Sequence, residues 1–200
     1  MPKKLILVRH GKTNAPVEKA FYGSTDLDLA PEEFDTLKAI SKITVDKIYC
    51  SPKKRCLQTS ALFFPTLPIE TLENAKEVDF GDWEGLTFPE IEKHSPHLID
   101  AWSNDPNFSF PNGESLKHFQ SRCEKLAKQL MDLEDETILL VCHGGVIRYL
   151  LCYFLDIDYQ DSYRFQASTA SFSYLQCYGP REASLNKFNL TEGFTWLESL

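Results

Sequence analysis

Short apolar runs alternate along the chain with stretches whose apolar residues recur every three or four positions. Three runs rich in branched side chains, at 5–8, 47–50 and 137–142, predict short buried strands. Helices are predicted from Ser51-Pro52 to about Phe64, over 114–134 and over 146–154. This alternation is typical of an α/β fold, a three-layer αβα sandwich around a mostly parallel sheet.

The final quarter of the chain has a different pattern. Residues 171–177 and 183–190 alternate between apolar and polar positions, and the turn-forming residues 178–181 separate them, which predicts a hairpin of edge strands. The segments 15–29 and 95–113 show no clear period and are predicted as long connections, which are often functional in compact domains. With no repeat or low-complexity linker, residues 1–200 are expected to form one domain.

Composition and charge narrow the class of protein. The chain has 21 Lys and Arg against 29 Asp and Glu, a net charge of −8, and no basic stripe, which argues against a nucleic-acid partner. No apolar run reaches the roughly 18 residues that a membrane span needs, and no signal-peptide pattern opens the chain, so a cytoplasmic protein is expected. Six scattered cysteines without a Cys-x-x-Cys pair are predicted to be buried free thiols.

The candidate chemistry lies at the ends of the three predicted strands. Arg9-His10-Gly11 follows the first strand, Arg55 lies shortly after the second, and His143-Gly144-Gly145 follows the third. The carboxyl ends of parallel strands meet at one sheet edge, where helix starts offer free N–H groups to an anion. Guanidinium groups can bind phosphate oxygens, one imidazole can attack phosphorus and another can donate to developing charge. Singly, His143 and Arg55 would more often be structural; their combination predicts a phosphate site.

Four segments in a fixed order carry a family resemblance: 5–11 with Arg9-His10-Gly11, 51–60 with Arg55, 77–85 with Glu77, and 141–148 with His143. The sequence resembles the histidine phosphatase (phosphoglycerate mutase-like) superfamily. The resemblance implies that His10 is a nucleophile that forms a phosphohistidine. Arg9, Arg55, His143 and Gly144 would bind the phosphoryl group, and Glu77 would protonate the leaving oxygen, with Asp79 as the alternative acid. It implies no metal and no cofactor, and the histidine spacing does not suit a zinc hydrolase.

The phosphate loop departs from the family pattern. Lys12 replaces a usual Glu, and Pro16 stands where the family has a phosphate-binding Asn. Asn14 would be the substitute, although it is displaced by two positions. Lys12 is either a rim cation or a solvated loop residue. Tyr22 and Gly23 resemble the substrate-side segment, although Gly23 also suits a plain turn.

Several other residues are expected to be structural. Trp83 and Trp102 are interpreted as packing residues, and Arg148 as a salt-bridge partner on its helix. Glu114-Ser115 is predicted to begin a helix. Surface or capping positions are expected for the remaining histidines, His94, His97 and His118.

Loop composition gives the substrate hypothesis. The segments 15–29 and 102–115 most resemble the α-ribazole phosphatase group, whose members remove a 5′-phosphate during assembly of the cobalamin nucleotide loop. The alternatives are a broad-specificity or phosphosugar phosphatase, less favoured a phosphoglycerate mutase, and a non-catalytic binding module. A non-catalytic module should lack at least one of the reactive residues, but all five are present: Arg9, His10, Arg55, Glu77 and His143. A small phosphorylated substrate is the expected partner, and a homodimer is left open.

Overall fold

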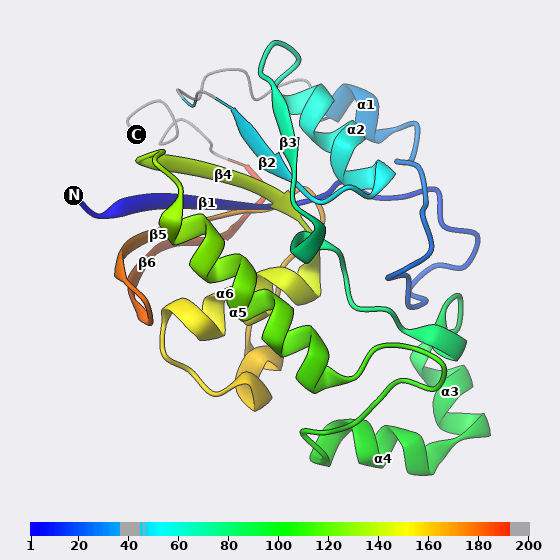
Figure 1. The fold of residues 1–200 in the computed structure, drawn as a ribbon. Coiled ribbons are helices and arrows are strands. Elements are labelled where there is room, and N and C mark those ends of the chain that lie inside the picture. The colour runs from blue at the N-terminus through cyan, green and yellow to red at the C-terminus, as the bar shows by residue number, and fades with distance from the viewer. Residues whose placement is uncertain (37–44, 46, 193–200) are drawn as a thin grey trace.

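In the computed structural model, which describes residues 1–36, 45 and 47–192, a mixed sheet forms the centre of the molecule (Figure 1). Its strand order is β3-β2-β4-β1-β5-β6. Strands β1 to β4 are mutually parallel, β5 runs antiparallel to β1, and β6 runs antiparallel to β5. The strand bounds are Lys3–Arg9 (β1), Ile48–Cys50 (β2), Ile69–Thr71 (β3), Thr137–Cys142 (β4), Phe172–Gly179 (β5) and Glu182–Leu190 (β6).

Alternate residues of the strands build two separate cores. In β1, Leu5 and Leu7 face the core that contains α5 (Leu116–Asp132) and α6 (Gly144–Phe154). The intervening Ile6 and Val8 face the other core, which contains the apolar side of α2 (Lys54–Phe63). Helices therefore cover both faces of the sheet (Figure 1), and the expected three-layer α/β architecture is confirmed.

The shorter helices lie mainly at the periphery. Figure 1 shows α3 and α4 beyond the sheet, beside the N-terminal end of α5. The bounds are Glu33–Thr36 (α1), Phe88–His94 (α3) and Pro96–Asn104 (α4), and 3₁₀ turns span Glu73–Ala75, Gly81–Trp83 and Tyr159–Arg164.

The strand and hairpin predictions are confirmed, with one refinement. Strand β5 pairs with β1 as well as with β6, so of the two hairpin strands only β6 is an edge strand, and the hairpin widens the sheet on the side of β1. Strand β3 was not predicted, because its three residues are exposed and lack an apolar pattern.

One predicted connection and the start of one predicted helix were wrong. The segment 95–113 is not one connection, because α4 occupies its first half. Pro96 opens that helix, where a missing N–H costs nothing. Helix α2 begins at Lys54 rather than at Pro52. Its N-cap, Lys53, makes no side-chain capping bond, and Ser51 instead lies at the functional edge described below.

The six cysteines are all buried and unpaired, as predicted. Burial raises the pKa of Cys50 to about 12, so this thiol stays protonated at neutral pH. In the described part of the chain, no helix has the length and apolar character to cross a membrane.

The N-cap of α5 offers a test of the local structure. The Ser115 hydroxyl accepts a hydrogen bond from the His118 N–H (3.1 Å), so Ser115→Ala should lower the free energy of unfolding by about 1 kcal/mol. Ser121→Ala, at an exposed position within the same helix, is the matched control and should not destabilise the protein. Urea denaturation measures both changes; equal stability of the two variants would contradict the capping role.

Candidate active site

Three neighbouring strands, β1, β4 and β2, end side by side, and the residues that follow β1 and β2 still form hydrogen bonds with β4. The His10 N–H donates to the carbonyl of Cys142 (3.1 Å), and the Ser51 N–H donates to the carbonyl of Val141 (2.9 Å). His143 directly follows β4, which lies between β1 and β2. The predicted convergence of these segments at one edge of the sheet is therefore present in the structure.

His10 is poised as a neutral base with one free nitrogen. Its Nδ1 lies 2.7 Å from the carbonyl oxygen of Gly11, which assigns the ring proton to Nδ1 and leaves a lone pair on Nε2. The side chain is 8% exposed. Burial, reinforced by Arg9 and Arg55, lowers the pKa of His10 well below its ordinary value, so the ring is uncharged at neutral pH.

His143 lies behind His10, fully buried, with 5.2 Å between the two ring centroids. Its Nδ1 accepts a hydrogen bond from Arg55 Nε (3.2 Å), so Nε2 carries the proton and donates to Ser51 Oγ (2.8 Å). Burial and the neighbouring Arg55 lower the pKa of His143 well below the usual range. Both nitrogens are thus engaged by protein groups, and His143 does not itself line the cavity described below.

Arg55 is buried, with 1% of its surface exposed, and backbone oxygens orient it. Its NH1 donates to the carbonyl of Thr25 (2.7 Å), and its NH2 donates to that of Gly23 (2.9 Å). Each terminal nitrogen retains one further N–H for a ligand. Arg9 is different: it donates to the carbonyl of Ala167, but its buried Nε has no partner. Burial lowers the pKa of Arg9, and Glu77 partly opposes this effect.

Glu84 holds the loop whose carbonyls orient Arg55. Its two carboxylate oxygens accept hydrogen bonds from the backbone N–H groups of Gly23 (2.9 Å), Ser24 (2.8 Å) and Thr25 (3.1 Å). A Cβ on Gly23 would stand 1.7 Å from the carbonyl oxygen of Val78. Close backbone packing therefore requires glycine here, and Gly23 does not line the cavity. These hydrogen bonds to Glu84 were not predicted, because no regular spacing along the sequence links Glu84 to residues 23–25.

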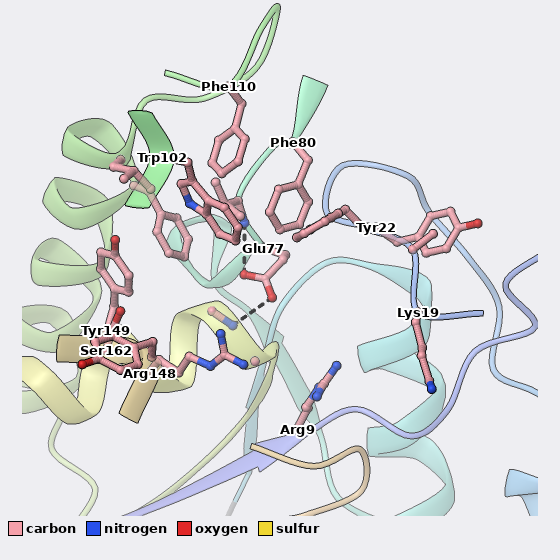
Figure 2. A pocket seen from close by; sticks show the side chains of 18 of the residues that line it. Arg9, Lys19, Tyr22, Glu77, Phe80, Trp102, Phe110, Arg148, Tyr149 and Ser162 are labelled. Atoms are coloured by element: carbon pink, nitrogen blue, oxygen red, sulfur yellow. Dashed lines mark hydrogen bonds between the residues drawn. The ribbon is translucent and has the colours of Figure 1, made fainter. Parts of the chain in front are cut away.

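Glu77 faces the cavity (Figure 2). Its carboxylate accepts hydrogen bonds from the N–H groups of Gly145 (2.9 Å) and Val78 (3.1 Å). A Cβ at position 145 would approach Glu77 Oε1 to 2.4 Å, so glycine at this helix start makes room for the acid. Asp79 instead accepts from the Gly81 N–H (3.0 Å) within its own loop and does not line the cavity. The geometry favours Glu77 over Asp79 as the acid.

These groups open into one cavity of about 1390 Å³. Arg9, His10, Arg55, Glu77 and Gly144 are among the polar groups that line it. A largely aromatic wall faces them: Phe21, Tyr22, Phe80, Trp102, Phe110, Phe119, Tyr149, Tyr159 and Tyr163. Figure 2 shows Trp102, Phe80 and Phe110 on the side of Glu77 opposite Arg9.

The remaining expectations for this region have mixed outcomes. Asn14 is exposed and does not line the cavity; its N–H donates to the carbonyl of Asp28 (3.1 Å). Lys12 and Tyr22 do line the cavity, and Lys12 is exposed there. Trp83 is a buried packing residue, as expected, but Trp102 lies on the cavity wall.

Arg148 corrects an expectation. We expected a salt-bridge partner on its helix, yet no ion pair or hydrogen bond of its side chain occurs among the residues that the structure describes. Instead the side chain lines the cavity and extends toward Glu77 and Arg9, and its buried Nε has no hydrogen-bond partner (Figure 2). Its spacing of four from Gly144 places both on one face of α6, a signal that could have located it in the cavity.

Metal ligands are not gathered here: within residues 1–36, 45 and 47–192, no group of three or more His, Cys, Asp or Glu side chains could hold an ion. The cations that line the cavity are the side chains of Arg9, Arg55, Arg148, Lys12 and Lys19.

Comparisons with known proteins agree with this geometry. A family model for the histidine phosphatase superfamily (branch 1) matches residues 5–191. The adenosylcobalamin/alpha-ribazole phosphatase of Escherichia coli K12 is 25% identical, over 85% of this chain and 88% of that protein. The alpha-ribazole phosphatase of Shigella flexneri superposes with a TM-score of 0.82 at 25% identity, over 94% of this chain and 96% of the other. A histidine-to-alanine variant of phosphoserine phosphatase from Entamoeba histolytica was solved with phosphoserine. It superposes with a TM-score of 0.80 at 25% identity, over 95% of this chain and 98% of the other.

The buried neutral histidines should make stability fall on acidification. The folded pKa of both His10 and His143 lies below the unfolded value of about 6.5, so the unfolded chain takes up protons that the native state does not. Stability present above this pH is lost below it, at up to about 1.4 kcal/mol per pH unit for each histidine. Urea denaturation between about pH 7 and 5 measures the slope.

His10→Asn should remove one histidine's share of that slope, whereas His97→Asn, at an exposed position, should leave it intact. An unchanged slope in His10→Asn would show that His10 is already protonated in the native protein.

Proposed function

Because the chain belongs to the histidine phosphatase superfamily (branch 1), we propose that this phosphatase hydrolyses phosphate monoesters through a phosphohistidine at His10. The observation that carries the proposal is the uncharged His10, whose free Nε2 shares a cavity with Arg9 and Arg55. A neutral imidazole is a nucleophile, and two guanidiniums offset the charge of a phosphoryl group without a metal.

In the first step, His10 Nε2 attacks phosphorus, and the bond between phosphorus and the ester oxygen breaks. Glu77, in its protonated form, transfers its proton to the departing oxygen. In the second step, the Glu77 carboxylate takes a proton from water as the water oxygen attacks phosphorus. The phosphorus–nitrogen bond then breaks, which restores neutral His10 and releases phosphate.

The other residues have supporting roles in this proposal. Arg9 Nε and the two spare N–H groups of Arg55 would bind the phosphoryl oxygens. Gly144 begins α6 beside Arg9, where the helix start favours an anion. His143 would donate Nε2–H to a phosphoryl oxygen by exchanging its present partner, Ser51 Oγ.

His10→Ala should abolish both turnover and the acid-labile phosphoenzyme, because the alanine offers no atom for the covalent intermediate. Rapid acid quenching with ³²P-labelled substrate measures the intermediate, and phosphate release measures turnover. The parent enzyme should remain active after extensive chelation. His94→Ala, remote from the motifs and exposed, is the control. Turnover by His10→Ala near the parent rate would overturn the proposed mechanism.

For the natural substrate, we propose α-ribazole 5′-phosphate, a nucleotide with a flat apolar base. The aromatic wall, with the partly exposed Phe21 and Trp102, supports this choice, since base stacking on such side chains contributes roughly 1–3 kcal/mol. The Escherichia coli and Shigella flexneri relatives, named for this substrate, also support it. The product would serve cobalamin assembly.

A second candidate substrate is a phosphorylated amino or hydroxy acid. The observation that favours it is Arg148, whose unpartnered guanidinium nitrogen in the cavity suits a carboxylate. The Entamoeba histolytica relative was solved with phosphoserine, which carries such a group.

Competition between the two substrates separates these candidates. With α-ribazole 5′-phosphate and phosphoserine at equal concentration, kcat/KM should be at least about tenfold higher for the nucleotide. Trp102→Ala should reduce that preference, and Arg148→Gln should leave it in place. The opposite order of preference, lost in Arg148→Gln, would reject the nucleotide and support the acid.

A further inference from the structure

We propose that Arg122 and Glu114, outside the four motifs and far from His10 in sequence, are positioning residues that fix Glu77 for proton transfer. This inference rests on the proposed function, because it assigns a purpose to the loop that carries the acid. The two residues form a bracket around residues 74–79, which we call the acid loop.

Arg122 projects from α5 and uses its whole guanidinium in the bracket. NH1 donates to the carbonyls of Asn74 (3.0 Å) and Lys76 (2.5 Å), and NH2 donates to that of Glu77 (2.9 Å). Nε and NH2 donate to the two carboxylate oxygens of Glu114, at 2.7 and 2.9 Å. All five N–H donors of the side chain are therefore engaged, three of them by the acid loop.

Glu114 closes the bracket from the other side. Besides pairing with Arg122, its Oε2 accepts from the backbone N–H of Asp79 (3.3 Å), and its own N–H donates to the carbonyl of Asp79 (2.9 Å). Glu114 Oε1 also lies 2.7 Å from Nδ1 of the exposed His118. The backbone is thus held both at Glu77 and two residues beyond it.

The buried pair of Arg122 and Glu114 serves mainly to position the acid loop rather than to stabilise the fold. The two side chains are only 11% and 9% exposed, and a buried ion pair adds little net stability compared with apolar residues of similar volume. What the pair does provide is geometry, because a planar fork with five donors fixes several carbonyls at once. The Glu77 carboxylate is then set by the backbone on one side and by the Gly145 N–H on the other.

The bracket acts on the acid and not on the phosphate pocket. Arg55, which faces the phosphate, is oriented by the loop that Glu84 holds, and no bond of the bracket reaches that loop among the described residues. Loosening the bracket should therefore weaken protonation of the leaving oxygen while phosphate affinity is kept. Esters with poor leaving groups need that proton, and activated esters do not.

Arg122→Lys tests this inference, since it keeps the charge and removes the fork. We expect kcat/KM for an alkyl phosphate to fall at least tenfold, with less than a threefold loss for 4-nitrophenyl phosphate and an unchanged inhibition constant for inorganic phosphate. Glu77→Gln should show the same selective loss. Glu114→Gln, which keeps the shape of the carboxylate, should give a smaller loss of the same kind.

Leu130→Ala is the matched control, because it removes a buried contact of the same helix two turns from Arg122. It should lower the melting temperature without changing the ratio of the two kcat/KM values. If Arg122→Lys fails to fold, Glu114→Gln provides the same ratio.

Equal losses on both esters in Arg122→Lys and Glu114→Gln, as in the control, would overturn the positioning role and leave the phosphohistidine mechanism intact. Failure of the mechanism itself would appear separately, as a parent enzyme without an acid-labile phosphoenzyme.

Discussion

The arrangement of the site depends on keeping two imidazoles uncharged next to buried guanidiniums. Arg55 is almost inaccessible to water, and its charge disfavours a proton on both His10 and His143. A buried cation is tolerated only when its donors find acceptors, so the fold must bring backbone oxygens to it. The carbonyls of Gly23 and Thr25 and the ring of His143 meet that need. The loop after β1, which is distant from α2 in sequence, therefore has a defined position.

Two further carboxylates, Glu84 and Glu114, hold the loops on which the site depends. Glu84 binds the loop that binds Arg55, and Glu114, with Arg122, binds the loop that carries Glu77. Burial alone would raise the pKa of Glu84, but the hydrogen bonds from Thr25, Ser24 and Gly23 outweigh burial and lower it, so Glu84 remains an anion. The loop that orients Arg55 and the loop that carries Glu77 are thus held mainly by different charged groups, although Glu84 also accepts from the Phe80 N–H (3.3 Å), directly beyond the acid loop.

The strands and the residues that follow them could be predicted because both are recognised from a short stretch of consecutive residues. An apolar run followed by Arg9-His10 or by His143 needs only the topology of a parallel sheet to converge. The roles of Glu84 and Arg122 could not be obtained this way. The hydrogen bonds that join Glu84 to residues 23–25, and Arg122 to the acid loop, link a side chain to backbone groups 45 to 61 positions away, and no periodicity encodes such a pairing. Helix α4 was missed because three prolines in 95–113 suggested a loop, although Pro96 begins a helix.

The aromatic wall and the polar base of the cavity come from different parts of the fold, and they meet in the loop that carries Phe21 and that orients Arg55 through the Gly23 carbonyl. His10, Arg55 and His143 sit at strand ends or in the first turn of a helix, where the sheet fixes them. Phe21 and Trp102 come from a loop and from a peripheral helix. Their rings nevertheless meet at 5.8 Å, and Trp102 also packs edge-on against Trp83 at 5.5 Å. Substitution of the Phe21 or Trp102 side chain alone would change what the cavity accepts and would leave in place the backbone carbonyls that orient Arg55. The relatives are named for quite different phosphate esters, and loops and peripheral helices are the parts of a fold that most readily vary to accommodate such differences.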